Sequence, residues 1–76
     1  MVHGFTMVKS AVGKFEAFVT GIQDFEPVED AYIVAGNYDI IVEIEADEVY
    51  DVLRLVSSDI QGIKGVTDTK TYIALD

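Results

Sequence analysis

YIVAGNYDIIVEIEA, residues 32–46, decides the fold of this chain, because two strand-like runs meet in it with almost nothing between them. From Tyr38 onward, large apolar residues recur at every second position, which is typical of a half-buried strand. The pair Gly36-Asn37 favours a two-residue hairpin turn, because both residue types tolerate positive φ. The stretch therefore predicts two antiparallel strands, residues 28–35 and 38–45. The inward face of the second strand is predicted to consist of Tyr38, Ile40, Val42 and Ile44.

Helical periodicity flanks this hairpin on both sides. Apolar residues at spacings of three and four predict a first helix, capped by Ser10 and terminated before Pro27. A second helix is predicted to begin at Asp47 as N-cap and to end at the turn that contains Gly62 and Gly65. The buried residues are predicted to be Val12, Phe15, Val19 and Ile22 in the first helix and Val49, Leu53, Val56 and Ile60 in the second, with Phe18 and Val52 beside them.

Two further strands, residues 2–9 and 66–75, complete the predicted order of elements. That order is strand, helix, strand, strand, helix, strand. It is typical of a ferredoxin-like α+β fold, in which a four-stranded antiparallel sheet carries two helices on one face. We therefore expect residues 1–76 to form a single domain with this βαββαβ arrangement.

The composition limits the classes of function. The chain has no Cys and one His, which excludes disulfides, thiolate zinc sites and His-rich metal sites, and we expect no metal or cofactor. A formal net charge of -9 repels phosphate backbones and argues against direct nucleic-acid binding. We find no apolar run of membrane-spanning length and no signal-peptide pattern, so we expect a cytoplasmic protein that binds no membrane. Acidic surfaces also keep proteins soluble in concentrated salt, which is compatible with a halophilic archaeal source.

The sheet face away from the helices is expected to meet a second copy of the chain. A domain of this size buries only about 60% of the surface that its unfolded chain exposes, so it gains from association. Ile41 is predicted to lie on that open face among polar and acidic side chains, and such a face is too apolar to remain bare. The sequence therefore predicts an isologous homodimer, similar to a dimeric α+β barrel.

Most polar groups in the sequence have an ordinary structural explanation. The acidic residues around Glu45 and Asp47 lack the spacing of a calcium loop and are expected to form a solvated edge. His3 has no nucleophile motif beside it and is expected to be an ordinary strand residue. The segment from Gly62 to Gly65 lacks the ending of a phosphate loop. The net charge also argues against the stacking of nucleic-acid bases on tyrosine side chains. The candidates for such stacking would be Tyr32, Tyr38, Tyr50 and Tyr72.

The turn Gly36-Asn37-Tyr38-Asp39 leaves two interpretations open. It closes a hairpin in either case, but the predicted fold gives no reason for a carboxylate at Asp39. Backbone N–H groups of a tight turn can hold a carboxylate, and the Asp39 side chain can hold an ammonium group. A ligand that carries both groups is an amino acid, so the turn is a candidate amino-acid site.

The segment from Ala31 to the C-terminus closely resembles the effector-binding domain of the Lrp/AsnC regulators, also called the RAM domain. The resemblance rests on Gly36-x-Tyr38-Asp39 between two strands, the amphipathic helix, Gly65-Val66, and a last strand rich in Thr. The first strand and helix match the family by pattern. The chain begins at the first strand of that domain, so it resembles the stand-alone members that lack the helix-turn-helix.

The resemblance implies a regulatory module with no enzymatic activity. Members of the family dimerise through this domain, dimers often assemble into rings, and small effectors, commonly amino acids, bind between neighbouring dimers. Assembly with itself or with full-length regulators would alter transcription indirectly. Carried over to this sequence, the ligand-binding residues are Gly36, Asn37, Tyr38, Asp39, Val49, Tyr72, Ile73 and Ala74.

The alternative is a small dimeric α+β barrel enzyme of the monooxygenase or isomerase type. Its pocket would lie within one subunit, between the sheet and the helices. A polar pocket there, near His3 or a Tyr, would favour the enzyme. A filled core and a pocket between subunits would favour the regulatory module.

Overall fold

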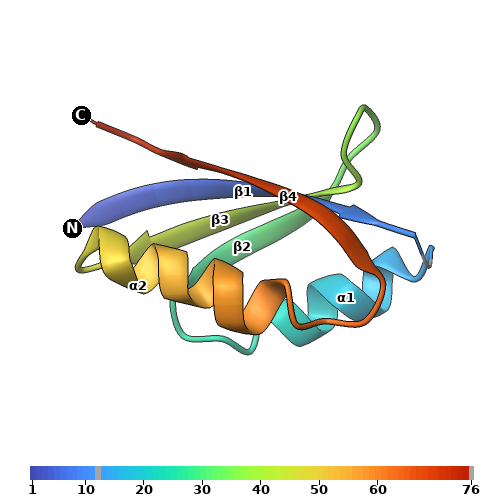
Figure 1. The fold of residues 1–76 in the computed structure, drawn as a ribbon, viewed down its shortest axis with the longest axis horizontal. Coiled ribbons are helices and arrows are strands. Elements are labelled where there is room, and N and C mark those ends of the chain that lie inside the picture. The colour runs from blue at the N-terminus through green and yellow to red at the C-terminus, as the bar shows by residue number, and fades with distance from the viewer. Residues whose placement is uncertain (12, 76) are drawn as a thin grey trace.

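The computed structural model describes residues 1–11 and 13–75, and its elements follow the predicted order (Figure 1). Val12, predicted on the buried side of the first helix, lies outside the described residues. The π-helix η1 continues α2 without a break, so the two form one helical rod. The elements are β1 (Val2–Ser10), α1 (Phe15–Ile22), β2 (Val28–Ile33), β3 (Ile40–Ala46), α2 (Val49–Arg54), η1 (Leu55–Ile60) and β4 (Val66–Ile73).

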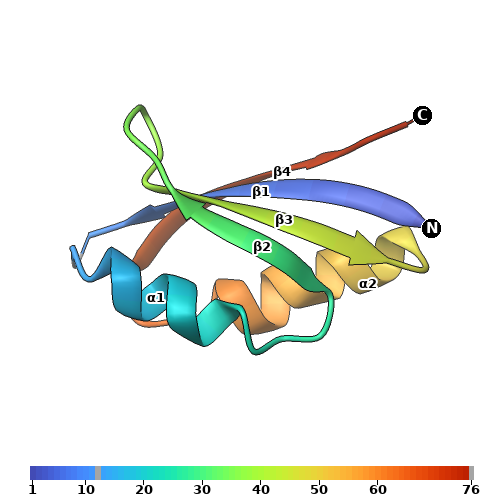
Figure 2. The same cartoon turned by 180° about the vertical axis from the view of Figure 1, so that it is seen from behind.

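The four strands form one antiparallel sheet in the order β2-β3-β1-β4. The long strand β1 lies inside the sheet and pairs with β3 on one side and β4 on the other. Both helices lie against the same face, below the sheet in Figure 1, and the view from behind in Figure 2 shows the other face bare. The predicted ferredoxin-like fold is therefore confirmed.

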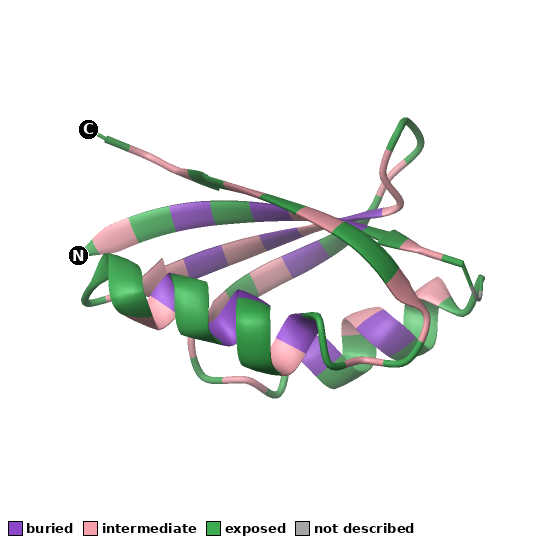
Figure 3. Ribbon diagram, viewed as in Figure 1, coloured by how far each residue is buried: buried purple, intermediate pink, exposed green. Residues whose placement is uncertain are grey.

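Alternation along the strands separates the core from the open face. In β3, Ile40, Val42 and Ile44 are fully buried, whereas Ile41 and Glu43 on the opposite face are half-buried. Thr6 and Val8 of β1 pair with Val42 and Ile40 and point to the same buried side, so buried and exposed bands alternate along the ribbon (Figure 3). The period-two pattern of the sequence thus correctly predicted the inward face of β3 from Ile40 onward.

In the second helix, Val56 and Ile60 are buried as predicted, but the other half of the predicted stripe is not. Val49 and Leu53 are 44% and 52% exposed, and Val52 and Leu55 are buried in their place. The helix widens along η1, where the Gln61 N–H donates to the Val56 carbonyl five residues back, at 2.9 Å. Val52, Val56 and Ile60 recur at a spacing of four along the buried side.

Both predicted helix caps are wrong. The second helix has Glu48, not Asp47, at its N-cap, without a capping bond from the side chain. Ser10 belongs to β1, where it pairs with Val66, and the first helix begins only at Phe15. The strand therefore extends through a residue whose type alone favours a helix cap, because pairing within the sheet overrides that local preference.

The first helix and the last turn follow their predicted patterns more closely. Ile22 is fully buried and Phe18 nearly so, with Phe15 and Val19 packed against the core. Gly65 has φ of 98°, a conformation that disfavours other residues, and it connects η1 to β4 as predicted. Among the described residues, the helices are too short and too polar to cross a membrane.

Candidate functional site

The connection between β2 and β3 is wider than the predicted two-residue hairpin. Ile33 and Ile40 form the last pair of the ladder, and residues 34–39 make the loop. The Val34 N–H donates to the Asp39 carbonyl at 2.8 Å and closes its base. Neither Gly36 nor Asn37 has positive φ, so the predicted tight turn is wrong.

Asp39 fixes this loop to the neighbouring strand. Its N–H donates to the Val8 carbonyl at 3.0 Å, and its Oδ2 accepts a hydrogen bond from the Ser10 N–H at 3.0 Å. The side chain therefore continues the hydrogen bonding of β1 beyond the end of β3. The expectation that the fold gives no reason for Asp39 is wrong, because the carboxylate holds the loop and β1 together.

Lys9 is a loop contact that the sequence analysis missed. Its Nζ donates to the Asn37 carbonyl at 3.1 Å. The two residues are 28 positions apart, so no local pattern indicates the contact. The loop is therefore held from one strand by a lysine side chain and by the backbone of Ser10.

Tyr38 lies on the open side of the sheet rather than on the predicted inward face. Its hydroxyl donates to Asp68 Oδ2 at 3.3 Å. Asp68 pairs with Lys9, whose side chain is on the face opposite the helices. Tyr38 also precedes β3, which begins at Ile40, so the strand alternation does not apply to it.

The tip of the loop presents free backbone donors. Within the part of the chain that the structure describes, the N–H groups of residues 35–38 donate to no protein acceptor. Ala35, Gly36 and Asn37 are exposed. Consecutive unpaired N–H groups are suited to holding an anion such as a carboxylate.

The last-strand candidates divide between the two faces of the sheet. Tyr72 pairs with Phe5 and is exposed on the open face. Ile73 is half-buried and packs against the core on the helix side. The Ala74 N–H donates to the His3 carbonyl at 2.9 Å, which places Ala74 beside the start of β1. Val49 is exposed at the first residue of α2.

The loop candidates and the last-strand candidates lie apart along β1. The loop binds the Val8 end of β1, and Ala74 binds His3 near the other end. Val8 lies five positions, about 17 Å, beyond His3 on β1 and three positions, about 10 Å, beyond Phe5, the partner of Tyr72. Figure 1 shows the loop and the C-terminal end of β4 projecting in opposite directions. One chain therefore does not bring the predicted site residues together.

The open face carries a close histidine–glutamate contact and a row of aromatic side chains. His3 Nε2 lies 3.1 Å from Glu45 Oε2, and the imidazole stacks on Phe5 with a centroid distance of 6.3 Å. The Asp30 carboxylate, through hydrogen bonding and charge, raises the pKa of the Tyr32 phenol, with a smaller contribution from Glu43. The face is therefore both apolar and negatively charged, as expected from the sequence.

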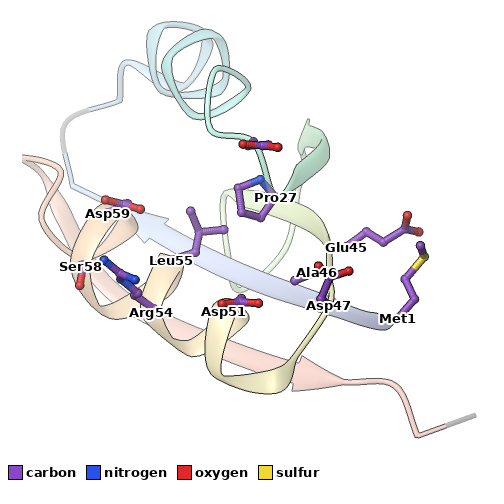
Figure 4. Close-up of a pocket in the computed structure, with 11 residues that line it drawn as sticks. Met1, Pro27, Glu45, Ala46, Asp47, Asp51, Arg54, Leu55, Ser58 and Asp59 are labelled. Atoms are coloured by element: carbon purple, nitrogen blue, oxygen red, sulfur yellow. The ribbon is translucent and has the colours of Figure 1, made fainter.

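A groove of about 690 Å³ opens between the α2–η1 rod and the connection that precedes β2 (Figure 4). None of the predicted site residues lines it. Among the described residues, no group of His, Cys, Asp or Glu side chains is arranged to hold a metal ion. The groove is lined by Met1, Glu26, Pro27, Glu45, Ala46, Asp47, Asp51, Arg54, Leu55, Ser58 and Asp59.

The space between the sheet and the helices is filled by the core. Ile22, Ile44 and Val52 are among the side chains fully buried there. The groove lies at the edge of this layer and has neither His3 nor a Tyr in its lining. The condition that would favour the enzyme alternative, a polar pocket under the helices near such a residue, is therefore not met by this groove.

Comparison with known proteins places this geometry in a family. A family model described as the Lrp/AsnC ligand binding domain matches residues 3–76. The leucine-responsive regulatory protein of Haemophilus influenzae is 25% identical over 71 residues, which cover 93% of this chain and 43% of the regulator. The chain thus spans less than half the length of the curated relatives it matches.

Solved structures agree with this assignment. A hypothetical protein from Pyrococcus horikoshii superimposes with a TM-score of 0.90 at 31% identity, covering 99% of this chain and 90% of that one. A transcriptional regulator from Neisseria meningitidis, solved in complex with L-Met, superimposes with a TM-score of 0.86 at 17% identity. That match covers 99% of this chain and 50% of the regulator. The chain belongs to the Lrp/AsnC family and carries its ligand-binding domain.

Proposed function

We propose that this chain is a non-enzymatic effector-binding and assembly module. Two copies pack their open sheet faces together into a homodimer, and dimers associate further, in a ring or a related assembly. A small effector, an amino acid, binds where neighbouring dimers meet. The module acts on transcription indirectly, by assembling with itself or with full-length Lrp/AsnC regulators.

The separation of the two candidate groups carries this proposal. Measured along β1 from Val8, where the loop of residues 34–39 is bound, Ala74 lies about 17 Å away beside His3, and Tyr72 lies about 10 Å away beside Phe5. A free amino acid is too small to contact both within one subunit. A site built from the loop of one subunit and the last strand of another uses both, and it exists only in the assembled state.

The chemistry of the loop suits the backbone of an amino acid. The unpaired N–H groups at its tip would hold the α-carboxylate, since residues 35–38 donate to no acceptor in the described chain. Asp39 would hold the ammonium group with the carboxylate oxygen that does not bind Ser10. Tyr72, Ile73, Ala74 and Val49 would surround the effector side chain. The regulator from Neisseria meningitidis, which was solved with L-Met, supports this class of ligand.

Binding of this kind couples the effector to assembly. A ligand that contacts two subunits stabilises the associated state more and more as its concentration rises above its dissociation constant, because the complete site is absent from the separated subunits. The effector would therefore raise the mass of the assembly at a fixed protein concentration.

The test is light scattering behind size exclusion, with and without a pool of amino acids, followed by titration of each amino acid that changes the mass. We expect an amino-acid-dependent increase in mass for the wild-type chain. Asp39→Asn should lose the increase, and Glu16→Gln, which removes one charge from the exposed surface of α1, should keep it. A constant mass together with no calorimetric heat for any amino acid would reject effector binding. A monomer under all conditions would reject assembly as well.

A further inference from the structure

His3 occupies a position on the open face where its charge state matters. It is the only histidine of the chain, and its ring lies between the Glu45 carboxylate, 3.1 Å away, and the Phe5 ring. The neutral imidazole can donate one hydrogen bond to Glu45, whereas the protonated ring also neutralises its charge. The proton therefore changes the charge of the face without changing its shape.

The open face has an excess of negative charge. The strand pairing puts four carboxylates and two lysines on it, so its net charge is -2 when His3 is neutral and -1 when His3 is protonated. The helices lie against the opposite face (Figure 2), and Glu45, the partner of His3, also lines the groove that contains Asp51, Arg54 and Asp59 of the α2–η1 rod. The charged groups of the open face are Asp30, Glu43, Glu45 and Asp68 against Lys9 and Lys70.

The immediate neighbours of His3 are mostly acidic. Glu45 is its direct cross-strand partner on β3, and Glu43 is the next residue of that strand on the same face. Tyr72 of β4 stands across from Phe5, and Lys70, two residues away and the next β4 residue on the same face, stands across from Met7. Just before β1, the Met1 ammonium group precedes His3 by two residues. Along the paired strands, the Glu45 and Glu43 carboxylates thus lie closer to His3 than Lys70 does.

We propose that protonation of His3 strengthens the association of two open faces and so makes the assembly sensitive to pH. The inference rests on the proposed function, because it assumes that the face is covered by a second copy. Packing two identical faces brings their net charges of -2 together and removes water from them, so repulsion opposes contact. Two protons, one on each His3, halve the net charge of both faces and compensate the two Glu45 carboxylates.

The direction of the pH dependence follows from linkage. A proton that favours the associated state is bound more tightly there than in the free subunit. Association therefore strengthens as the pH falls and His3 takes up its proton. If each of the two histidines binds its proton ten times more tightly in the dimer than in the free subunit, the dissociation constant of the dimer falls up to about 100-fold between about pH 8 and about pH 5.5.

The experiment measures the dissociation constant by sedimentation over a dilution series at several pH values in that range. His3→Gln is the decisive variant, because its amide keeps a donor for Glu45 and takes up no proton. We expect the wild-type chain to associate more tightly as the pH falls and His3→Gln to show a much flatter profile. A wild-type profile retained by His3→Gln would overturn the inference, since the surface carboxylates alone would then account for it.

A second readout uses the single histidine directly. Its ring protons give one set of NMR signals, and the midpoint of their titration should lie at higher pH in a concentrated, associated sample than in a dilute one. An equal midpoint in two samples of different mass would reject the coupling while leaving the assembly intact. A monomeric mass at every pH and concentration would instead reject the proposed function, on which the coupling depends.

Discussion

The Asp39 carboxylate accepts a hydrogen bond from the Ser10 N–H at 3.0 Å and thereby joins the β2–β3 loop to the end of β1. The residue proposed to hold the ammonium group of an effector is therefore also part of the fold. One carboxylate can serve both purposes, because its two oxygens have room for several hydrogen bonds. Variants at this position need to separate the charge of the side chain from its hydrogen bond.

Asp39→Asn and Asp39→Ala should separate the two roles. The amide keeps an acceptor for Ser10 and loses the charge, so Asn should lower the free energy of unfolding by less than about 1 kcal/mol while weakening effector binding. Alanine removes the carboxylate that accepts the hydrogen bond from the Ser10 N–H and should cost about 1–3 kcal/mol. Urea denaturation and calorimetric titration measure the two effects. Equal stability of the two variants would show that the hydrogen bond contributes little.

Phe5 and Tyr72 should be contacts between subunits. They face each other across β1 and β4 and are 38% and 52% exposed, so changing either to Ser should leave the separate subunit folded. Each change removes aromatic surface from the proposed interface and should weaken association about tenfold or more. Sedimentation at several concentrations measures this. Tyr50→Ser is the matched control, because Tyr50 is 67% exposed on α2 in the helix layer. An equal effect of all three variants would contradict the assignment of the interface.

The buried hydroxyl pair of Thr6 and Thr71 should show energetic coupling. Their Oγ1 atoms are 3.0 Å apart, and Thr6 is fully buried. Thr6→Val removes the hydrogen bond and leaves the Thr71 hydroxyl in a partly buried site, which should cost about 1–2 kcal/mol. Because the double change to Val leaves no hydroxyl without its partner, it should cost less than the sum of the single changes. Additive costs in denaturant titrations would mean that the two hydroxyls do not interact.

Gly4 and Gly21 should respond in opposite directions to the same substitution. A Cβ atom on Gly4 would lie 3.1 Å from Val52 Cγ1, because α2 approaches β1 closely there. Gly4→Ala should therefore destabilise the fold, by about 1–3 kcal/mol. A Cβ atom on Gly21 meets nothing within 4 Å, so Ala in this helical position should stabilise by about 0.5–1 kcal/mol. The free energies of unfolding compare the two variants, and a stabilised Gly4→Ala would show that α2 moves away easily.

The sequence was most informative where one spacing of apolar residues extends over a whole strand or helix. Alternation predicted the buried residues Ile40, Val42 and Ile44 of β3, and the order of elements predicted the sheet and the position of both helices. It was least informative at the ends of elements. Ser10 has the residue type of a helix cap but extends β1, and residues 34–39 form a loop where a tight hairpin was expected.

The second helix shows a further limit of periodicity. A spacing of 3.6 residues per turn predicted Val49 and Leu53 as buried, and both are exposed. The π-helical turns of η1 shift the buried side toward Val52 and Leu55. A change in helix type is set by packing against the sheet, and a short apolar sequence contains no separate signal for it.

The sequence by itself determined the family, the ferredoxin-like fold and the acidic, cysteine-free character of the chain, because these follow from composition and from patterns between near neighbours. Only the tertiary structure decided what Asp39 binds and how far the loop lies from Tyr72 and Ala74. The Ser10–Asp39 hydrogen bond joins residues 29 positions apart, and its existence depends on the register of β1 against β3. Such a contact comes from the packing of the complete sheet, so no local run of residues specifies it.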